Sequence, residues 1–155
     1  MKEQEKKIMM IDLCARLPYG VKGKVETTDG NGKEIKDDGV INSVFINEHG
    51  GVYICIEGAE YELEDVKPYL RPLSSMTEEE KKYLENNFRF YFDECSDGIT
   101  NGIYYAIFNR TIYQMINEDD ISDIIDWLNA HHFDYRGLIE NGLALPAPNE
   151  MYNIK

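Results

Sequence analysis

The first half of the chain alternates between apolar and polar residues over short stretches. A period of two residues is typical of half-buried strands, and turn-forming residues interrupt it at 28–33 and 48–51. The alternation at 21–26, the β-branched and aromatic residues at 39–47 and the turns between them predict four short antiparallel strands, at residues 21–26, 39–47, 52–57 and 60–63. Residues 65–70 follow the last strand and are predicted to form a helical turn before Pro72.

Short twisted strands of this kind leave unpaired edges if they remain an open sheet. Closure into a small barrel removes these edges. We therefore expect residues 8–72 to form an SH3-like antiparallel barrel. An open or sandwich-like meander is the alternative.

The second half combines helical and strand-like patterns. Thr77 and Glu80 have the spacing of a capping box, which predicts a helix from residue 78 to about residue 86. A second helix is predicted from Asp119 or Asp120 to the histidine pair at 131–132. Its apolar residues recur on one helical face, at Ile121, Ile124, Ile125 and Leu128.

Another, shorter helix is predicted after the histidine pair, and the two helices form a C-terminal helix pair. Asp134 is placed to cap it, and Gly142 stands where a helix that ends at residue 141 would need a glycine. The aromatic-rich segments 88–92 and 103–108 are expected to pair as strands, and 143–148 to form an extended tail that packs on the body. The prediction is an α+β chain in which an α+β half at 77–150 packs on the barrel as one unit.

The composition is that of an acidic globular protein. The chain has 155 residues, of which 43% are hydrophobic, and a formal net charge of −13. This excess of acid argues against a general duplex-binding surface, because such surfaces neutralise phosphates with Lys and Arg. Residues 1–72 carry 10 basic and 14 acidic side chains (net −4), and residues 73–155 carry 6 and 15 (net −9). The acidic half serves solubility or offers a face to a basic partner.

Neither a membrane nor a metal is expected as a partner. No apolar run approaches the ~20 residues that cross a bilayer, and the four apolar residues at 8–11 are too short for a secretory signal. Cys14, Cys55 and Cys95 form no C-x-x-C pair, which argues against a zinc or redox motif. Free thiols fit the cytoplasm. We expect a cytoplasmic protein that needs no cofactor and does not bind nucleic acid directly.

The densest group of candidate site residues lies in one segment near the C-terminus. It combines an indole, two imidazoles, a carboxylate, a phenol and a guanidinium, at Trp127, His131, His132, Asp134, Tyr135 and Arg136. A histidine with an aspartate could act as a general base, and the group could also be a binding hot spot. A zinc site is disfavoured because zinc needs three or four ligands. The structural alternative is that Asp134 caps a helix and the histidines end the preceding one.

Two further tyrosines flank the predicted barrel. Tyr19 lies in the segment 16–20 and Tyr69 in the segment 67–72, and each segment also contains a proline and an arginine. Rigid Pro and Tyr residues can line a groove for an extended peptide, or they can seal the open ends of a small barrel. The aromatic residues between 88 and 108 are expected in the core or in an interface patch.

Three strings give the chain a resemblance to a known family. They are DLCARLPYGVK at 12–22, VKPYLRPLSSMT at 66–77 and WLNAHHFDYRGLI at 127–139. Together they resemble small proteins encoded in prophage and mobile-element regions of gut Bacteroidales. The resemblance implies an accessory, cytoplasmic protein of phage origin. It implies no activity and no catalytic residue.

Three functional hypotheses follow. The first is a non-enzymatic module that binds another protein, because no catalytic motif is recognisable and aromatic residues are abundant. The second is an acidic inhibitor or nucleic-acid mimic, which the charge of the second half favours. The third is an enzyme that uses His131, His132 or Asp134, which requires these groups to meet in a pocket.

Overall fold

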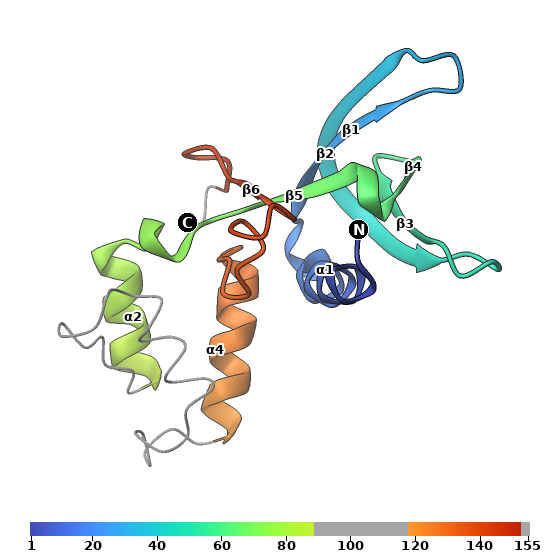
Figure 1. The fold of residues 1–155 in the computed structure, drawn as a ribbon. Coiled ribbons are helices and arrows are strands. Elements are labelled where there is room, and N and C mark those ends of the chain that lie inside the picture. The colour runs from blue at the N-terminus through green and yellow to red at the C-terminus, as the bar shows by residue number, and fades with distance from the viewer. Residues whose placement is uncertain (89–117, 153–155) are drawn as a thin grey trace. The chain divides into compact units, whose positions relative to one another are not determined.

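The computed structural model describes residues 1–88 and 118–152 and has a mixed α+β fold. The chain divides into two compact units. Unit 1 comprises Met1–Leu70 and Gly137–Lys155, and unit 2 comprises Arg71–Arg136. The chain therefore leaves unit 1, forms unit 2, and returns to finish unit 1 (Figure 1).

Unit 1 is built on one mixed sheet of six strands in the order β4-β3-β2-β1-β5-β6. Neighbouring strands are antiparallel except β5 and β6, which are parallel. The four predicted strands are present with shifted ends, and β2 is much longer than expected. The bounds are β1 Lys22–Thr28, β2 Glu34–Ile46, β3 Val52–Ile56, β4 Ala59–Glu62, β5 Val66–Leu70 and β6 Leu145–Pro146.

Residues 66–70 form a strand, so the predicted helical turn there is wrong. The helical conformation is limited to one 3-10 turn at Leu63–Asp65, and the chain is extended from Val66 onward. The strand forms because β5 pairs with β1, with Val66 opposite Val25 and Pro68 opposite Gly23. Long-range pairing thus prevailed over the local preference of this segment.

The sheet does not close, so the structure shows no barrel. A helix, α1 (Glu3–Arg16), takes over part of the burial that closure would have supplied. Met9 and Leu13 of α1 are fully buried in the same core as strand residues such as Val25, Ile41 and Ile54. A helix packed on a sheet is a common way to cover an apolar face.

Helix α1 was missed because its burial pattern is partly inverted. Ile8 and Ile11 are each 42% exposed, whereas Asp12 and Arg16 are fully buried. The two charges are tolerated inside because Arg16 Nε donates to Asp12 Oδ2 at 2.7 Å and Arg16 Nη2 donates to Asp12 Oδ1 at 3.0 Å. A pattern that assumes apolar residues inside cannot identify such a helix.

The C-terminal tail packs on unit 1, as the sequence predicted. Leu138 and Ala144 belong to the unit 1 core, and β6 pairs with β5. Figure 1 shows this returning segment (red) beside β5 (green). Farther on, the Tyr152 hydroxyl accepts from the Lys22 amide at 2.9 Å and donates to the Tyr69 carbonyl at 2.8 Å.

The second helix of the predicted C-terminal pair is absent from residues 134–141, which form turns instead. Gly137 adopts the left-handed conformation, with φ at 72°, and this interrupts any right-handed helix through the segment. Asp134 does not begin a helix, and its amide donates to the Arg71 carbonyl at 2.8 Å. One turn follows and ends at Gly142, whose φ is 70°.

Unit 2 contains α2 (Glu78–Phe88) and α4 (Glu118–Ala130). The capping box is confirmed, because the Glu80 amide donates to Thr77 Oγ1 and the Thr77 amide donates to Glu80 Oε2. The helices share a core made of Leu73, Met76, Leu84, Ile124, Leu128 and Phe133. Phe88 ends α2, and the rest of the predicted strands at 88–92 and 103–108 lies outside the described residues. Among those described, no helix has both the length and the apolar character to cross a membrane.

Candidate functional site

The segment that follows α4 is held against Arg71 by backbone hydrogen bonds. The Arg71 amide donates to the His132 carbonyl at 2.8 Å, and the Asp134 amide donates to the Arg71 carbonyl at 2.8 Å. Phe133 lies between these bonds and forms an isolated parallel bridge with Arg71. The segment is therefore fixed as an extended turn at the C-terminal end of α4.

Trp127 is the centre of a stack of rings in unit 2. Tyr83 of α2 lies parallel to it, with ring centroids 5.7 Å apart and an angle of 16°. Phe133 stacks on it at 5.8 Å and His131 at 3.9 Å. Trp127 is half-buried and Tyr83 is 46% exposed. The stacked rings therefore extend from the buried Phe133 to the exposed Tyr83.

Arg71 supports the stack from its buried end. Its guanidinium carbon lies 4.1 Å from the centroid of the Phe133 ring. The same guanidinium donates to both carboxylate oxygens of Glu80, at 2.7 and 2.9 Å. Burial raises the pKa of Glu80, but the hydrogen bonds from Arg71 and Thr77 more than offset this, and the pKa is lowered overall. Glu80 is therefore ionised at neutral pH and keeps Arg71 in place.

His131 is held as a neutral imidazole. Its Nδ1 lies 2.8 Å from the Trp127 carbonyl oxygen, and a carbonyl can only accept, so Nδ1 carries the proton. Burial lowers the pKa of His131 below its ordinary value of 6.5. His131 therefore presents a flat, uncharged ring beside the indole near neutral pH.

The remaining candidate residues of this segment range from buried to exposed. They are His132, Asp134, Tyr135 and Arg136. His132 is only 3% exposed and adopts a left-handed backbone, with φ at 57°. Asp134 is buried, and the Tyr135 hydroxyl donates to Asn129 Oδ1 at 3.1 Å. Arg136 is exposed and lies over the Tyr135 ring at 4.9 Å. Within residues 1–88 and 118–152, no three His, Cys, Asp or Glu residues are grouped to hold a metal ion.

Tyr19 and Tyr69 both belong to unit 1. Tyr19 ends a 3-10 turn (Leu17–Tyr19) and is 39% exposed. Tyr69 lies in β5 and is partly buried, and its carbonyl accepts the hydrogen bond from Tyr152. The structure thus places both tyrosines in unit 1 and Trp127, His131 and Tyr135 in unit 2.

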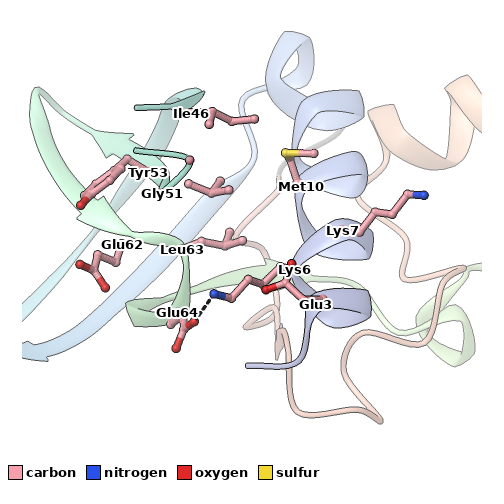
Figure 2. A pocket seen from close by; sticks show the side chains of 12 residues that line it. Glu3, Lys6, Lys7, Met10, Ile46, Gly51, Tyr53, Glu62, Leu63 and Glu64 are labelled. Carbon is pink, nitrogen blue, oxygen red and sulfur yellow. Dashed lines mark ion pairs between the residues drawn. The ribbon is translucent and has the colours of Figure 1, made fainter. Parts of the chain in front are cut away.

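A cleft in unit 1 was not anticipated from the sequence. It lies between α1 and the end of the β2–β3 hairpin, with the turn after β4 at its base (Figure 2). Its volume is about 290 Å³, and its lining includes Met10, Ile46, Val52 and Leu63. Sequence reasoning missed this α1 cleft because it depends on a helix that the sequence pattern did not predict.

Searches of protein-family models, of curated proteins and of solved structures found no match to this chain.

Proposed function

We propose that the protein is a non-enzymatic module that binds another protein through the stacked rings of Tyr83, Trp127 and His131, which we call the aromatic surface. The observation that carries this proposal is the 46% exposure of Tyr83 while its ring lies on Trp127. Tyr and Trp are enriched at protein interfaces, because they combine a large apolar area with a polar atom.

The aromatic surface is also preorganised. Trp127 contacts the buried Phe133 ring, which in turn lies against the Arg71–Glu80 pair. His131 is fixed by its bond to the Trp127 carbonyl. Rings that are already ordered lose little conformational freedom on binding, so more of the contact energy contributes to affinity.

The resemblance to prophage and mobile-element proteins supports an accessory role in the cytoplasm of a bacterial host. Proteins of this kind would act on a host or phage protein. The acidic-mimic hypothesis stays a prediction, and so does the hypothesis of catalysis by His131, His132 or Asp134.

The test is affinity capture of the tagged full chain from a gut Bacteroidales lysate, with and without nuclease. We expect a stoichiometric protein partner that Tyr83→Ala loses and that Ile11→Ala retains. Ile11 is a matched control because it is a similarly exposed large hydrophobic residue in unit 1. Circular dichroism of both variants establishes that they are folded.

The affinity for the purified partner is then measured by calorimetry. Loss of a tyrosine hot spot costs about 2 kcal/mol or more, or about thirtyfold in Kd. Equal affinities of the wild type and Tyr83→Ala would refute the aromatic surface as the site. A partner that processes nucleic acid and is displaced by DNA would favour the acidic-mimic hypothesis instead.

A further inference from the structure

The aromatic surface spans two helices that lie side by side in opposite directions (Figure 1). Tyr83 belongs to α2 and Trp127 belongs to α4. The direction follows from Arg71, which binds Glu80 near the start of α2 and donates from its amide to the His132 carbonyl just after the end of α4. The start of α2 and the end of α4 are therefore neighbours.

An exposed carboxylate lies beside the stacked rings on each helix. Glu79 is four residues before Tyr83 in α2, and Asp123 is four residues before Trp127 in α4. Residues four apart lie on the same face of a helix. Because the helices run in opposite directions, Glu79 lies toward the end of α4 and Asp123 lies toward the end of α2. The two carboxylates thus flank the aromatic surface at its two ends.

The lysines of α2 do not neutralise Glu79. Lys81 binds Glu78 and lowers its pKa, and the charge of Lys82 lowers that pKa further. Neighbouring residues of a helix do not face each other, so both lysines act on a different side of α2 from Glu79. Among the residues that the structure describes, none forms an ion pair with Glu79.

The remaining charges of unit 2 leave the aromatic surface in negative surroundings. Arg71 is neutralised by Glu80, to which it donates two hydrogen bonds of 2.7 and 2.9 Å. Asp123 has no ion pair within residues 1–88 and 118–152. The sequence of unit 2 has the same balance, since residues 71–136 carry 6 basic and 13 acidic side chains (net −7).

His131 adds another hydrogen-bond acceptor at the aromatic surface. Its Nδ1 donates to the Trp127 carbonyl, so the neutral ring leaves a lone pair on Nε2. Nε2 makes no hydrogen bond to the described residues, and it is not among their polar atoms that are buried without a partner. The polar groups beside the rings are therefore acceptors, and a ligand has to supply the donors.

The chain itself shows which side chain suits an aromatic ring beside a carboxylate. The guanidinium carbon of Arg71 lies 4.1 Å from the centroid of the Phe133 ring while its nitrogens donate to Glu80. Arg136 lies over the Tyr135 ring at 4.9 Å. A guanidinium is planar and weakly hydrated, so it stacks on a ring while its edge donates to a carboxylate. A lysine ammonium has no such plane.

We propose that the aromatic surface selects an arginine side chain of the partner protein. The guanidinium lies against the exposed part of the Tyr83 ring, and its N–H groups are directed at the acceptors beside the rings, Glu79, Asp123 and His131 Nε2. This inference rests on the proposed function, because it names the chemistry that the aromatic surface recognises. Opposite charges also favour the encounter of the two proteins.

The test is selection of short random peptides, displayed on phage, against the folded full chain at neutral pH. We expect the enriched peptides to share an arginine. Trp127 is the only tryptophan of the chain, so its fluorescence should change when these peptides bind. Replacing the arginine by citrulline, which keeps the plane but not the charge, should weaken binding about tenfold or more, because charge-assisted hydrogen bonds are lost. Replacing it by lysine should also weaken binding.

Two double variants with the same change in net charge locate the site. Glu79→Gln/Asp123→Asn removes the carboxylates beside the rings and should weaken peptide binding and reduce its dependence on salt. Glu85→Gln/Asp126→Asn is the matched control, because neither residue is three or four positions from the ring of its helix. The control should bind the peptides as the wild type does. Circular dichroism establishes that both variants are folded.

The proposal is overturned if no peptide is enriched, if the enriched peptides do not need their arginine, or if the two double variants bind them equally. Tyr83→Ala separates this result from the proposed function, since it should abolish peptide binding. If Tyr83→Ala loses the peptides but their arginine is dispensable, the aromatic surface remains the binding site and only its selectivity for arginine is refuted. Unchanged binding to Tyr83→Ala would instead refute the aromatic surface itself.

Discussion

The buried pair of Asp12 and Arg16 gives the sharpest test of how unit 1 is stabilised. Both side chains are fully buried, one helical turn apart on α1. Replacing Asp12 by leucine would leave the Arg16 guanidinium in the core without its bidentate acceptor. Replacing both, as Asp12→Leu with Arg16→Met, would leave apolar side chains of similar length.

The two changes should differ strongly in cost. Removing one partner of a buried ion pair typically destabilises a protein by about 3–5 kcal/mol, because a charge that stays in the core loses its bidentate hydrogen bonds. Replacing both partners with apolar residues is often neutral or even stabilising. A domain of ordinary stability has about 5–15 kcal/mol in total. Asp12→Leu alone should therefore remove much of the stability of unit 1, and the second substitution should restore most of it.

The assay is urea unfolding at neutral pH, followed by circular dichroism for the wild type, both single variants and the double variant. In this double-mutant cycle, the double variant should lose less free energy of unfolding than the sum of the losses in the two single variants. Ile11→Leu, an exposed position on the same helix, controls for substitution in α1 as such. A cost below about 1 kcal/mol for Asp12→Leu, or additive costs in the double variant, would refute the reasoning.

Three further predictions concern single contacts. Tyr152→Phe removes the hydrogen bonds to the Lys22 amide and the Tyr69 carbonyl and should cost about 1–3 kcal/mol in urea unfolding. Burial raises the pKa of Tyr152 to about 12 from 10.0. Its contribution to stability should therefore be complete below pH 10 and decline as the pH rises toward 12, and Tyr152→Phe should lack this decline. Thr77→Ala removes the cap of α2 and should lower stability by about 1 kcal/mol, whereas an unchanged urea midpoint would contradict the role of the capping box. Gly137→Ala forces a side chain into the left-handed region and should destabilise by about 1–2 kcal/mol, while Gly30→Ala, where nothing lies within 4 Å of an added Cβ, should not destabilise. Equal melting temperatures of the two glycine variants would argue against strain at residue 137.

The elements that could be predicted from sequence are those whose signals are local. The capping box of Thr77 and Glu80 fixes the start of α2 within a few residues. The apolar face at Ile124 and Leu128 identifies α4, and the alternation at residues 21–26 identifies β1. Each of these depends on neighbours within one or two turns of the chain.

The elements that were missed depend on partners far away in the sequence. Val66–Leu70 becomes a strand because β1 is there to pair with it. Helix α1 buries Asp12 and Arg16, which a hydrophobic pattern places outside. The candidate site likewise combines a local signal that could be predicted with long-range contacts that could not. The segment around Trp127 was visible as a run of functional groups, but its support by Tyr83, Arg71 and Glu80 was not.

The return of the chain to unit 1 has a consequence for the order of folding. β1 to β5 are connected by short segments and can pair as soon as they are made, whereas β6 and Leu138 join them only after residues 71–136 have been synthesised. At typical synthesis rates of about 5–20 residues per second, this interval lasts several seconds. During it, Leu70 lacks its β6 partner, and the sheet has an unpaired edge at β5. During these seconds the free β5 edge of a nascent chain can pair with a strand of another chain. This risk ends when β6 pairs with β5.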